Sequence, residues 1–313
     1  MRIYAPDYYR KFKCVAARCR HNCCIGWEID IDKSTYKKYS AVGDDFGSRL
    51  KDGIIIENGS AHFVLEDGER CPFLNSNNLC DIIINLGEDS LCEICAAHPR
   101  YRNFFDSREE VGLGLCCETA AELILTRAEK TKLVAVGDKA EDETESAEED
   151  MFFKLRERIL GILQNRELSI DDRIEGLFEN FGIDLPDKSL GEWAEVFLGL
   201  ERLDDEWTNK LNKLSDKEFV DCKMKDGKIA AALEQLLVYF VLRHLSDGIY
   251  DGRLYERAAF AVLSMRIICA VGVYAVSADE RLDVPFLIEA ARMYSLEIEY
   301  SDENIERLLE CLS

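Results

Sequence analysis

The stretch CVAARCRHNCC, at residues 14–24, contains four of the thirteen cysteines of this chain of 313 residues. The N-terminal residues that precede it are polar and aromatic and lack the apolar segment of a secretory signal, so we expect a reducing compartment. Clustered thiols in such a compartment usually bind metal or do redox work, because disulfides are rare there. Six further cysteines continue the array: Cys71, Cys80, Cys92, Cys95, Cys116 and Cys117.

The number of cysteines exceeds the needs of one metal site, because four thiolates complete one zinc site or one iron–sulfur cluster. Only Cys92 and Cys95 have the Cys-x2-Cys spacing of which a zinc ribbon needs two copies. Cys71-Pro72 is similar to cysteine–proline placements beside iron–sulfur clusters. The spacing therefore favours iron–sulfur over zinc, with redox thiols free of metal as a third reading. It disfavours radical chemistry on S-adenosylmethionine, because Gly26 stands where Cys-x3-Cys-x2-Cys needs its third cysteine.

Two pairs of cysteines are adjacent in the sequence, Cys23-Cys24 and Cys116-Cys117. In an extended segment, neighbouring side chains point to opposite sides. We therefore expect the two members of a pair not to face one metal together. Either one member is structural, or each pair is shared between two centres.

The chain divides into a Cys-rich part, 1–133, and a helical part, 151–313. The first has turn signals, short strand-like runs at 27–31, 53–56 and 61–65, and helical pieces at 1–13, 34–39 and 118–130. Such short elements cannot build a deep core, so we expect metal to supply part of the folding energy. An acidic linker is predicted at 134–150, which includes AEDETESAEED at 140–150.

From residue 151 onward, apolar residues recur at three- and four-residue spacing, which predicts helices almost throughout. Ser169, Ser189 and Ser301 are predicted to begin three of them. The apolar stretch 258–278 is predicted to be a buried core helix and not a membrane span, because it contains Arg266. The predicted fold class is mainly α: a small Cys-rich α+β metal-binding domain followed by an all-helical domain.

The formal net charge of −22 argues against nonspecific binding of nucleic acid or anionic membrane, since phosphate would be repelled over most of the surface. We expect a cytoplasmic protein that binds neither. A solvated acidic surface for solubility explains the bias without any further role.

Four segments together carry a family resemblance. They are CCIGWE at 23–28, CPFLN at 71–75, LCDIIINLGEDSLC at 79–92 and CAAHPRYR at 95–102. With LGLCCETAAELIL at 113–125 and LEQLLVYFVLRHLSDGIYDG at 233–252, they resemble the flagellin lysine-N-methylase family. The resemblance implies a cytoplasmic bacterial enzyme that methylates flagellin lysines from S-adenosylmethionine and holds a four-iron (4Fe-4S) cluster.

Carried over residue by residue, the resemblance implies a set of metal-binding cysteines. Cys92 and Cys116 are additions to the family pattern, and His98 replaces a more usual aromatic residue, which makes it a candidate extra ligand or hydrogen-bond partner. The implied ligands are Cys14, Cys19, Cys23, Cys24, Cys71, Cys80, Cys95 and Cys117.

Methyl transfer to an amine requires a neutral lysine and a methyl donor held in line. His244 is the candidate base, with Asp251 to orient it and Tyr250 nearby; the alternative is a core histidine satisfied by a backbone carbonyl. Arg100, Arg102 and Arg243 are candidates to bind the carboxylate of S-adenosylmethionine, although surface ion pairing is the commoner role of such residues.

The sequence shows no complete Gly-x-Gly-x-x-Gly fingerprint of a nucleotide-binding fold, since Gly112-Leu113-Gly114 is only a fragment. We therefore hypothesise a donor site next to the cluster, where an open iron would bind the amino and carboxyl groups. Two other function classes remain. One is a noncatalytic scaffold stapled by zinc or iron, and the other is a redox protein.

Overall fold

The computed structural model describes residues 2–138 and 146–313, which fold as two compact units. The smaller unit is Lys13–Arg100, and the larger comprises Met1–Phe12 with Tyr101–Ser313. This division differs from the predicted boundary at residue 133, because the N-terminal strand pairs with later strands and so joins the helical part. The predicted linker is also shorter at both ends, because Leu133–Asp138 is a strand and Ala147 begins a helix. The centre of the linker, 139–145, lies outside the described residues.

The smaller unit contains a three-stranded antiparallel sheet of order β2-β4-β3, formed by Asp30–Ile31, Ser60–Phe63 and Ile54–Glu57. These strands confirm the three predicted runs, each somewhat shorter or shifted. The predicted helix at 34–39 is α1. A small core of Ile29, Tyr39, Phe63 and Phe73 includes the buried Cys71 and Cys92. The four helices are α1 (Lys33–Ser40), α2 (Asp45–Asp52), α3 (Asp81–Leu86) and α4 (Glu93–Ala97).

A four-stranded sheet of order β5-β6-β1-β7 carries the N-terminus of the chain. Its strands are β1 (Arg2–Pro6), β5 (Arg100–Phe104), β6 (Arg108–Leu113) and β7 (Leu133–Asp138). β1 runs parallel to β6 and antiparallel to β7. The predicted helix at 1–13 is therefore wrong, except for a single 3-10 turn at Tyr9–Lys11. Partners more than 100 residues away supply the hydrogen bonds that make this segment a strand.

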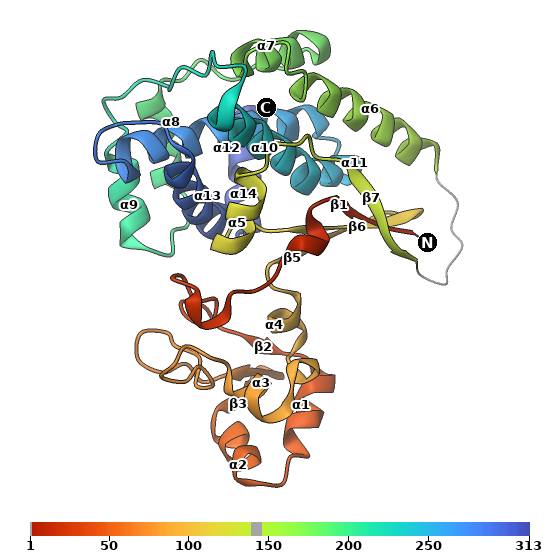
Figure 1. Cartoon of the computed structure of the whole chain (residues 1–313), viewed down its shortest axis with the longest axis vertical. Coiled ribbons are helices and arrows are strands. Elements are labelled where there is room, and N and C mark those ends of the chain that lie inside the picture. Colours follow the sequence, from red (N-terminus) through yellow and green to blue (C-terminus); the bar gives the residue numbers. More distant parts are fainter. Residues whose placement is uncertain (1, 139–145) are drawn as a thin grey trace. The chain divides into compact units, whose positions relative to one another are not determined.

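Helices form the rest of the larger unit (Figure 1). All three predicted starts are confirmed: Ser169 and Ser189 form capping boxes, and the Ser301 side chain accepts a hydrogen bond from the Asn304 N–H. The helices are α5 (Glu118–Leu125), α6 (Ala147–Leu163), α7 (Ile170–Phe181), α8 (Leu190–Leu198), α9 (Asp205–Asn212), α10 (Gly227–His244), α11 (Gly248–Asp251), α12 (Leu254–Val271, continued by a π turn Gly272–Val276), α13 (Val284–Ile298) and α14 (Asp302–Leu312).

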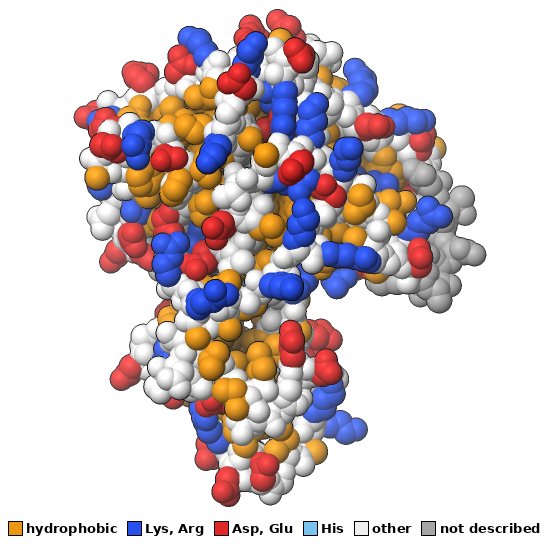
Figure 2. Space-filling view, viewed as in Figure 1, with side chains coloured by type: hydrophobic (Ala, Val, Ile, Leu, Met, Phe, Trp, Pro, Cys, Tyr) orange, Lys and Arg blue, Asp and Glu red, His pale blue; other side chains and the backbone are white. Residues whose placement is uncertain are grey.

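The core of the larger unit lies around α10 and α12, whose side chains are almost all buried. Two helical stretches, Gly227–Asp251 and Leu254–Val276, are long and apolar enough to cross a membrane, and most of each is buried inside the protein. Burial of this kind confirms the predicted core helix. On the face of the protein in Figure 2, Lys and Arg side chains are interspersed with acidic ones, so the acidic bias does not make this face uniformly negative.

Candidate metal centre and buried polar cluster

Short backbone hydrogen bonds bring distant cysteines of the smaller unit together. The Cys71 N–H donates to the Cys24 carbonyl at 2.9 Å, which ties the second cysteine segment to the first. Cys80 pairs with Leu74 in a β-bridge and then stands at the start of α3. Cys92 stands at the start of α4, which contains Cys95. These thiols are therefore held in place by turns and by the first residues of short helices.

The thiols of Cys23 and Cys24 share a hydrogen bond, as do those of Cys92 and Cys95. Each bond lowers the pKa of one member, Cys23 or Cys92, to about 7 and raises that of its partner. The expectation that adjacent cysteines point apart is thus wrong at Cys23-Cys24. These two residues lie in a turn, and the rule of opposite faces holds only for extended backbone.

Six thiols interact electrostatically and form what we call the six-cysteine group. Cys24 interacts with Cys71 and Cys80, and Cys95 interacts with Cys24 and Cys71. Burial raises the pKa of Cys71 to about 11. Burial also raises the pKa of Cys80, although N–H groups at the start of α3 oppose the shift. The group consists of Cys23, Cys24, Cys71, Cys80, Cys92 and Cys95.

Five of the eight predicted ligands belong to this group, and so does Cys92, which the family pattern does not require. Cys14 is exposed, and its sulfur accepts the Ala16 N–H at 3.4 Å. Cys19 donates to the His21 carbonyl at 3.2 Å. Cys117 belongs to the larger unit, where it precedes α5.

One set of three side chains has ligand atoms close enough together to hold a single ion. Within residues 2–138 and 146–313, this set of His, Cys, Asp or Glu side chains, whose ligand atoms all lie within 4.8 Å of one another, contains no cysteine.

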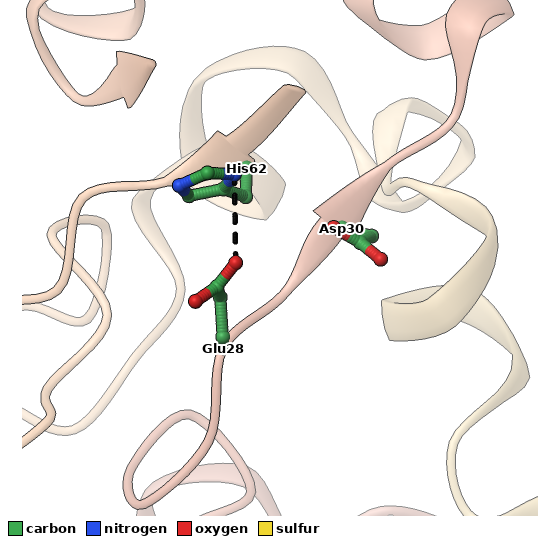
Figure 3. A group of neighbouring side chains, drawn as sticks. All are labelled: Glu28, Asp30 and His62. Carbon is green, nitrogen blue, oxygen red and sulfur yellow. Dashed lines mark ion pairs between the residues drawn. The ribbon is translucent and has the colours of Figure 1, made fainter. Parts of the chain in front are cut away.

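That one set consists of Glu28, Asp30 and His62. Asp30 lies on β2, Glu28 lies two residues before it, and His62 lies on β4, the strand that pairs with β2. Figure 3 shows the Glu28 carboxylate turned toward the imidazole, with Oε1 at 3.4 Å from Nδ1. Sequence reasoning missed this group because His62 is more than 30 residues from Glu28 and Asp30 and reaches them only through the pairing of β4 with β2. Both carboxylates are exposed, and exposed acidic groups of this kind are common without an ion.

His98, the candidate extra ligand, ends α4 in the smaller unit. Its ring centroid lies 6.2 Å from that of Trp27. Burial, followed by the charge of Arg100, lowers the pKa of His98 to about 4. The imidazole is therefore neutral at pH 7, the state that a metal ligand needs.

The three predicted carboxylate-binding arginines have different surroundings. Arg100 donates weakly to the carbonyls of its own segment, at 3.4 and 3.5 Å. Arg102 is half-exposed and forms an ion pair with the buried Glu109. Arg243 is buried and bound to Glu299, so its charge is already neutralised inside the protein.

Glu299, just after α13, is the centre of a buried polar cluster in the larger unit. Its carboxylate accepts hydrogen bonds from the Tyr239 hydroxyl at 2.9 Å and from Arg243 Nε at 3.1 Å, and it lies 2.7 Å from His244 Nε2. Arg243 also donates to the Tyr239 hydroxyl at 2.7 Å. Burial alone would raise the pKa of Glu299, but Arg243 and the His244 hydrogen bond outweigh it and hold the pKa at about 2.

His244, the predicted base, is enclosed in this cluster. Burial lowers its pKa despite the Glu299 hydrogen bond, so it is neutral at pH 7. The rings of Phe240 and Phe260 pack against it. The surroundings of His244 are therefore closer to the alternative interpretation, a core histidine whose ring is held by a hydrogen bond. Its partner is the Glu299 carboxylate and not a backbone carbonyl.

Asp251, which we expected to orient His244, instead accepts from Arg257 at 2.6 Å. Tyr250 is exposed and donates to the Phe104 carbonyl at 2.8 Å. Glu299 takes the place of Asp251 because the residues after α13 come back to the end of α10. A partner 55 residues from His244 in the sequence leaves no local signal.

The buried cluster reaches the surface through Tyr300. The Arg243 guanidinium lies over the Tyr300 ring, 5.1 Å from its centroid. The Tyr300 hydroxyl lies 3.1 Å from the sulfur of Cys116, and the Tyr300 ring is partly exposed. The cluster thus links the Cys116-Cys117 turn to residues 239–300.

A family model and several curated proteins match parts of the chain. Residues 188–313 match the family model described as the FliB lysine N-methylase C-terminal domain. The lysine-N-methylase of Salmonella typhimurium is 29% identical over 133 residues, which cover 39% of this chain and 32% of that protein. The flagellar biosynthetic protein FliU of Salmonella muenchen is 29% identical over 133 residues, 39% of this chain and 76% of FliU.

The aligned part spans about a third of the length of the lysine-N-methylase that it matches. No solved structure matches the chain. Arg243, His244 and Glu299 all lie within the matching residues, whereas the six-cysteine group precedes them. Residues 188–313 are thus similar to the C-terminal domain of FliB lysine N-methylases, and the chain also aligns with a Salmonella lysine-N-methylase over 133 residues.

Proposed function

We propose that this protein is a lysine N-methyltransferase that transfers methyl groups from S-adenosylmethionine to lysine side chains of flagellin in the cytoplasm. The observation that carries the proposal is the match of residues 188–313 to the lysine N-methylase C-terminal domain. The name of the FliU relative, a flagellar biosynthetic protein, supports flagellin as the substrate.

In this reaction the lone pair of a neutral lysine amine attacks the methyl carbon, and the carbon–sulfur bond of the sulfonium breaks. S-adenosylhomocysteine leaves, and the proton of the amine passes to solvent or to a base. His244 is neutral, but its Nε2 faces Glu299 at 2.7 Å. We therefore assign His244 and Glu299 to positioning: they hold Arg243 and Tyr239, and the Arg243 guanidinium in turn lies over the Tyr300 ring.

We further propose that the six-cysteine group holds a 4Fe-4S cluster. The donor set supports this proposal, because thiolates are the ligands of such clusters and the group offers more than the four that one cluster needs. When bound, the cluster would supply an iron able to take the amino and carboxyl groups of the methyl donor. Arg100 follows the group by five residues and is the arginine we propose to contact the donor carboxylate.

The second candidate is a noncatalytic role, in which a bound metal only stabilises the fold of the smaller unit. The small apolar core of that unit, which includes cysteines, favours it. The two candidates differ in whether the protein binds a methyl donor at all.

The deciding experiment is methyl transfer with protein purified without oxygen. Flagellin and S-adenosylmethionine labelled in its methyl group are incubated with the protein, and the flagellin peptides are analysed by mass spectrometry. The proposal requires labelled methyl groups on lysine side chains. If no label reaches flagellin while the protein retains its metal, the structural-metal candidate takes its place.

A further inference from the structure

A groove lies along α7 of the larger unit, apart from the six-cysteine group and the Glu299 cluster. Its volume is about 530 Å³. One face of α7, the turn that follows it and Arg266 of α12 line the groove. Nothing in the function proposed above uses these residues.

The sequence of α7 makes the groove amphipathic. Ile174 and Phe178 are four residues apart and form an apolar floor, with Ile174 buried and Phe178 half-buried. Glu175 and Glu179 repeat the same spacing one residue later and form an exposed acidic rim. Gly182 then ends the helix with φ of 61°, which lets Asp184 turn back to extend that rim.

The carboxylates of the acidic rim are not engaged in ion pairs among the described residues. Among the described residues, no Lys, Arg or His forms an ion pair with Glu175, Glu179 or Asp184. Some exposed carboxylates in this unit do form an ion pair along their helix, as Asp150 does with Lys154 at 2.7 Å. Like charges four residues apart repel each other, so a cation bound at the rim would relieve Glu175 and Glu179.

Arg266 is the one basic residue that lines the groove. It forms no ion pair within residues 2–138 and 146–313, and its guanidinium lies 5.7 Å from the centroid of Phe219. A fourth carboxylate, Asp171, is partly satisfied by the Cys222 N–H at 3.0 Å. The groove thus keeps a net negative charge beside an apolar floor.

We infer that this groove binds a lysine-bearing segment of the protein substrate, an inference that rests on the proposed lysine methylation. The methylene stem of a lysine would pack on Ile174 and Phe178, and its ammonium would lie between Glu175 and Glu179. Because the rim is exposed, a small metabolite would stay largely in water, unlike ligands of enclosed sites. A phosphate-bearing ligand would meet the carboxylates and be repelled.

The test measures binding of a fluorescein-labelled peptide of lysine, alanine and leucine to the full chain at low salt. A matched peptide with glutamine in place of lysine serves as the negative probe. The double variant Glu175→Gln/Glu179→Gln is expected to bind the lysine peptide about three- to ten-fold more weakly, as loss of two exposed ion pairs implies. Its melting temperature should not fall, because the change removes a repulsion.

Two further variants guard against a trivial loss of binding. Arg266→Gln removes the cation from the groove and is expected to tighten binding about two-fold, an effect that unfolding cannot produce. Glu303→Gln/Glu310→Gln makes the same charge change on α14 and should leave affinity unchanged. Equal loss in both double variants, or none in Glu175→Gln/Glu179→Gln, overturns the inference.

The outcomes also separate this inference from the proposed function. If flagellin is methylated and Glu175→Gln/Glu179→Gln leaves KM unchanged, the groove is not the docking site although the function stands. If no methyl group is transferred but peptide affinity follows the charge pattern, the groove binds cationic segments and the proposed reaction is wrong.

Discussion

Glu299 is a fully buried carboxylate whose lowered pKa contributes to the stability of the larger unit. Its pKa falls from an ordinary value of 4.5 to about 2, and each unit of pKa is worth about 1.36 kcal/mol. The ionised carboxylate therefore contributes about 3 kcal/mol to the free energy of unfolding. This value agrees with the cost of about 3–5 kcal/mol found in other proteins when one partner of a buried ion pair is removed, as Glu299→Gln would do to Arg243.

The sign of the pH dependence follows from the lowered pKa. The contribution is fully present above pH 4.5, where Glu299 is ionised in both the folded and unfolded chain, and is lost as pH falls toward 2. We expect Glu299→Gln to lose about 3 kcal/mol at pH 7 and progressively less below pH 4.5, measured by urea unfolding monitored by circular dichroism.

The matched control is Glu306→Gln, which breaks a surface ion pair with Arg253 of 2.8 Å. Exposed pairs contribute less than about 1 kcal/mol, so this variant should unfold almost as the native protein does. A loss at Glu299 no larger than at Glu306, or a loss that does not shrink in acid, would refute the assignment of Glu299 as the centre of the cluster.

Three further changes test other parts of the account. Cys24→Ser should abolish most of the bound iron of protein purified without oxygen, whereas Cys311→Ser on α14 should keep it; equal iron in both would exclude Cys24 as a ligand. Ser189→Ala removes a capping box and should cost about 1 kcal/mol in urea unfolding, and an unchanged midpoint would show that the cap is dispensable. Gly112→Ala places a methyl group against the Tyr101 ring and should cost about 1–3 kcal/mol, while an unchanged melting temperature would contradict this packing.

Local signals in the sequence predicted local structure well. Ser169, Ser189 and Ser301 begin helices because a hydroxyl that accepts an N–H in the first turn acts within three residues. The helix α9, Asp205–Asn212, was missed, since only Trp207 and Leu211 of its eight residues are buried apolar groups. Such a helix has too few apolar positions to show a period.

Contacts between residues that are far apart in the chain could not be predicted from the sequence. Pairing of β1 with β7, which moved the N-terminus into the larger unit, depends on partners such as Ala5 and Val134. The turn at Cys23-Cys24 overrode the alternation of an extended segment. Glu299 became the partner of His244 although Asp251 is nearer in the chain, because tertiary packing decided which carboxylate reaches the imidazole.

The central claim is that this protein methylates lysine and that the six-cysteine group is required. The most direct test compares methyl transfer from S-adenosylmethionine to flagellin by the native protein and by Cys24→Ser, both purified without oxygen. We predict lysine methylation by the native protein and its loss in Cys24→Ser together with the iron. Undiminished methylation by an iron-free Cys24→Ser protein, or none by the iron-loaded native protein, would contradict the claim.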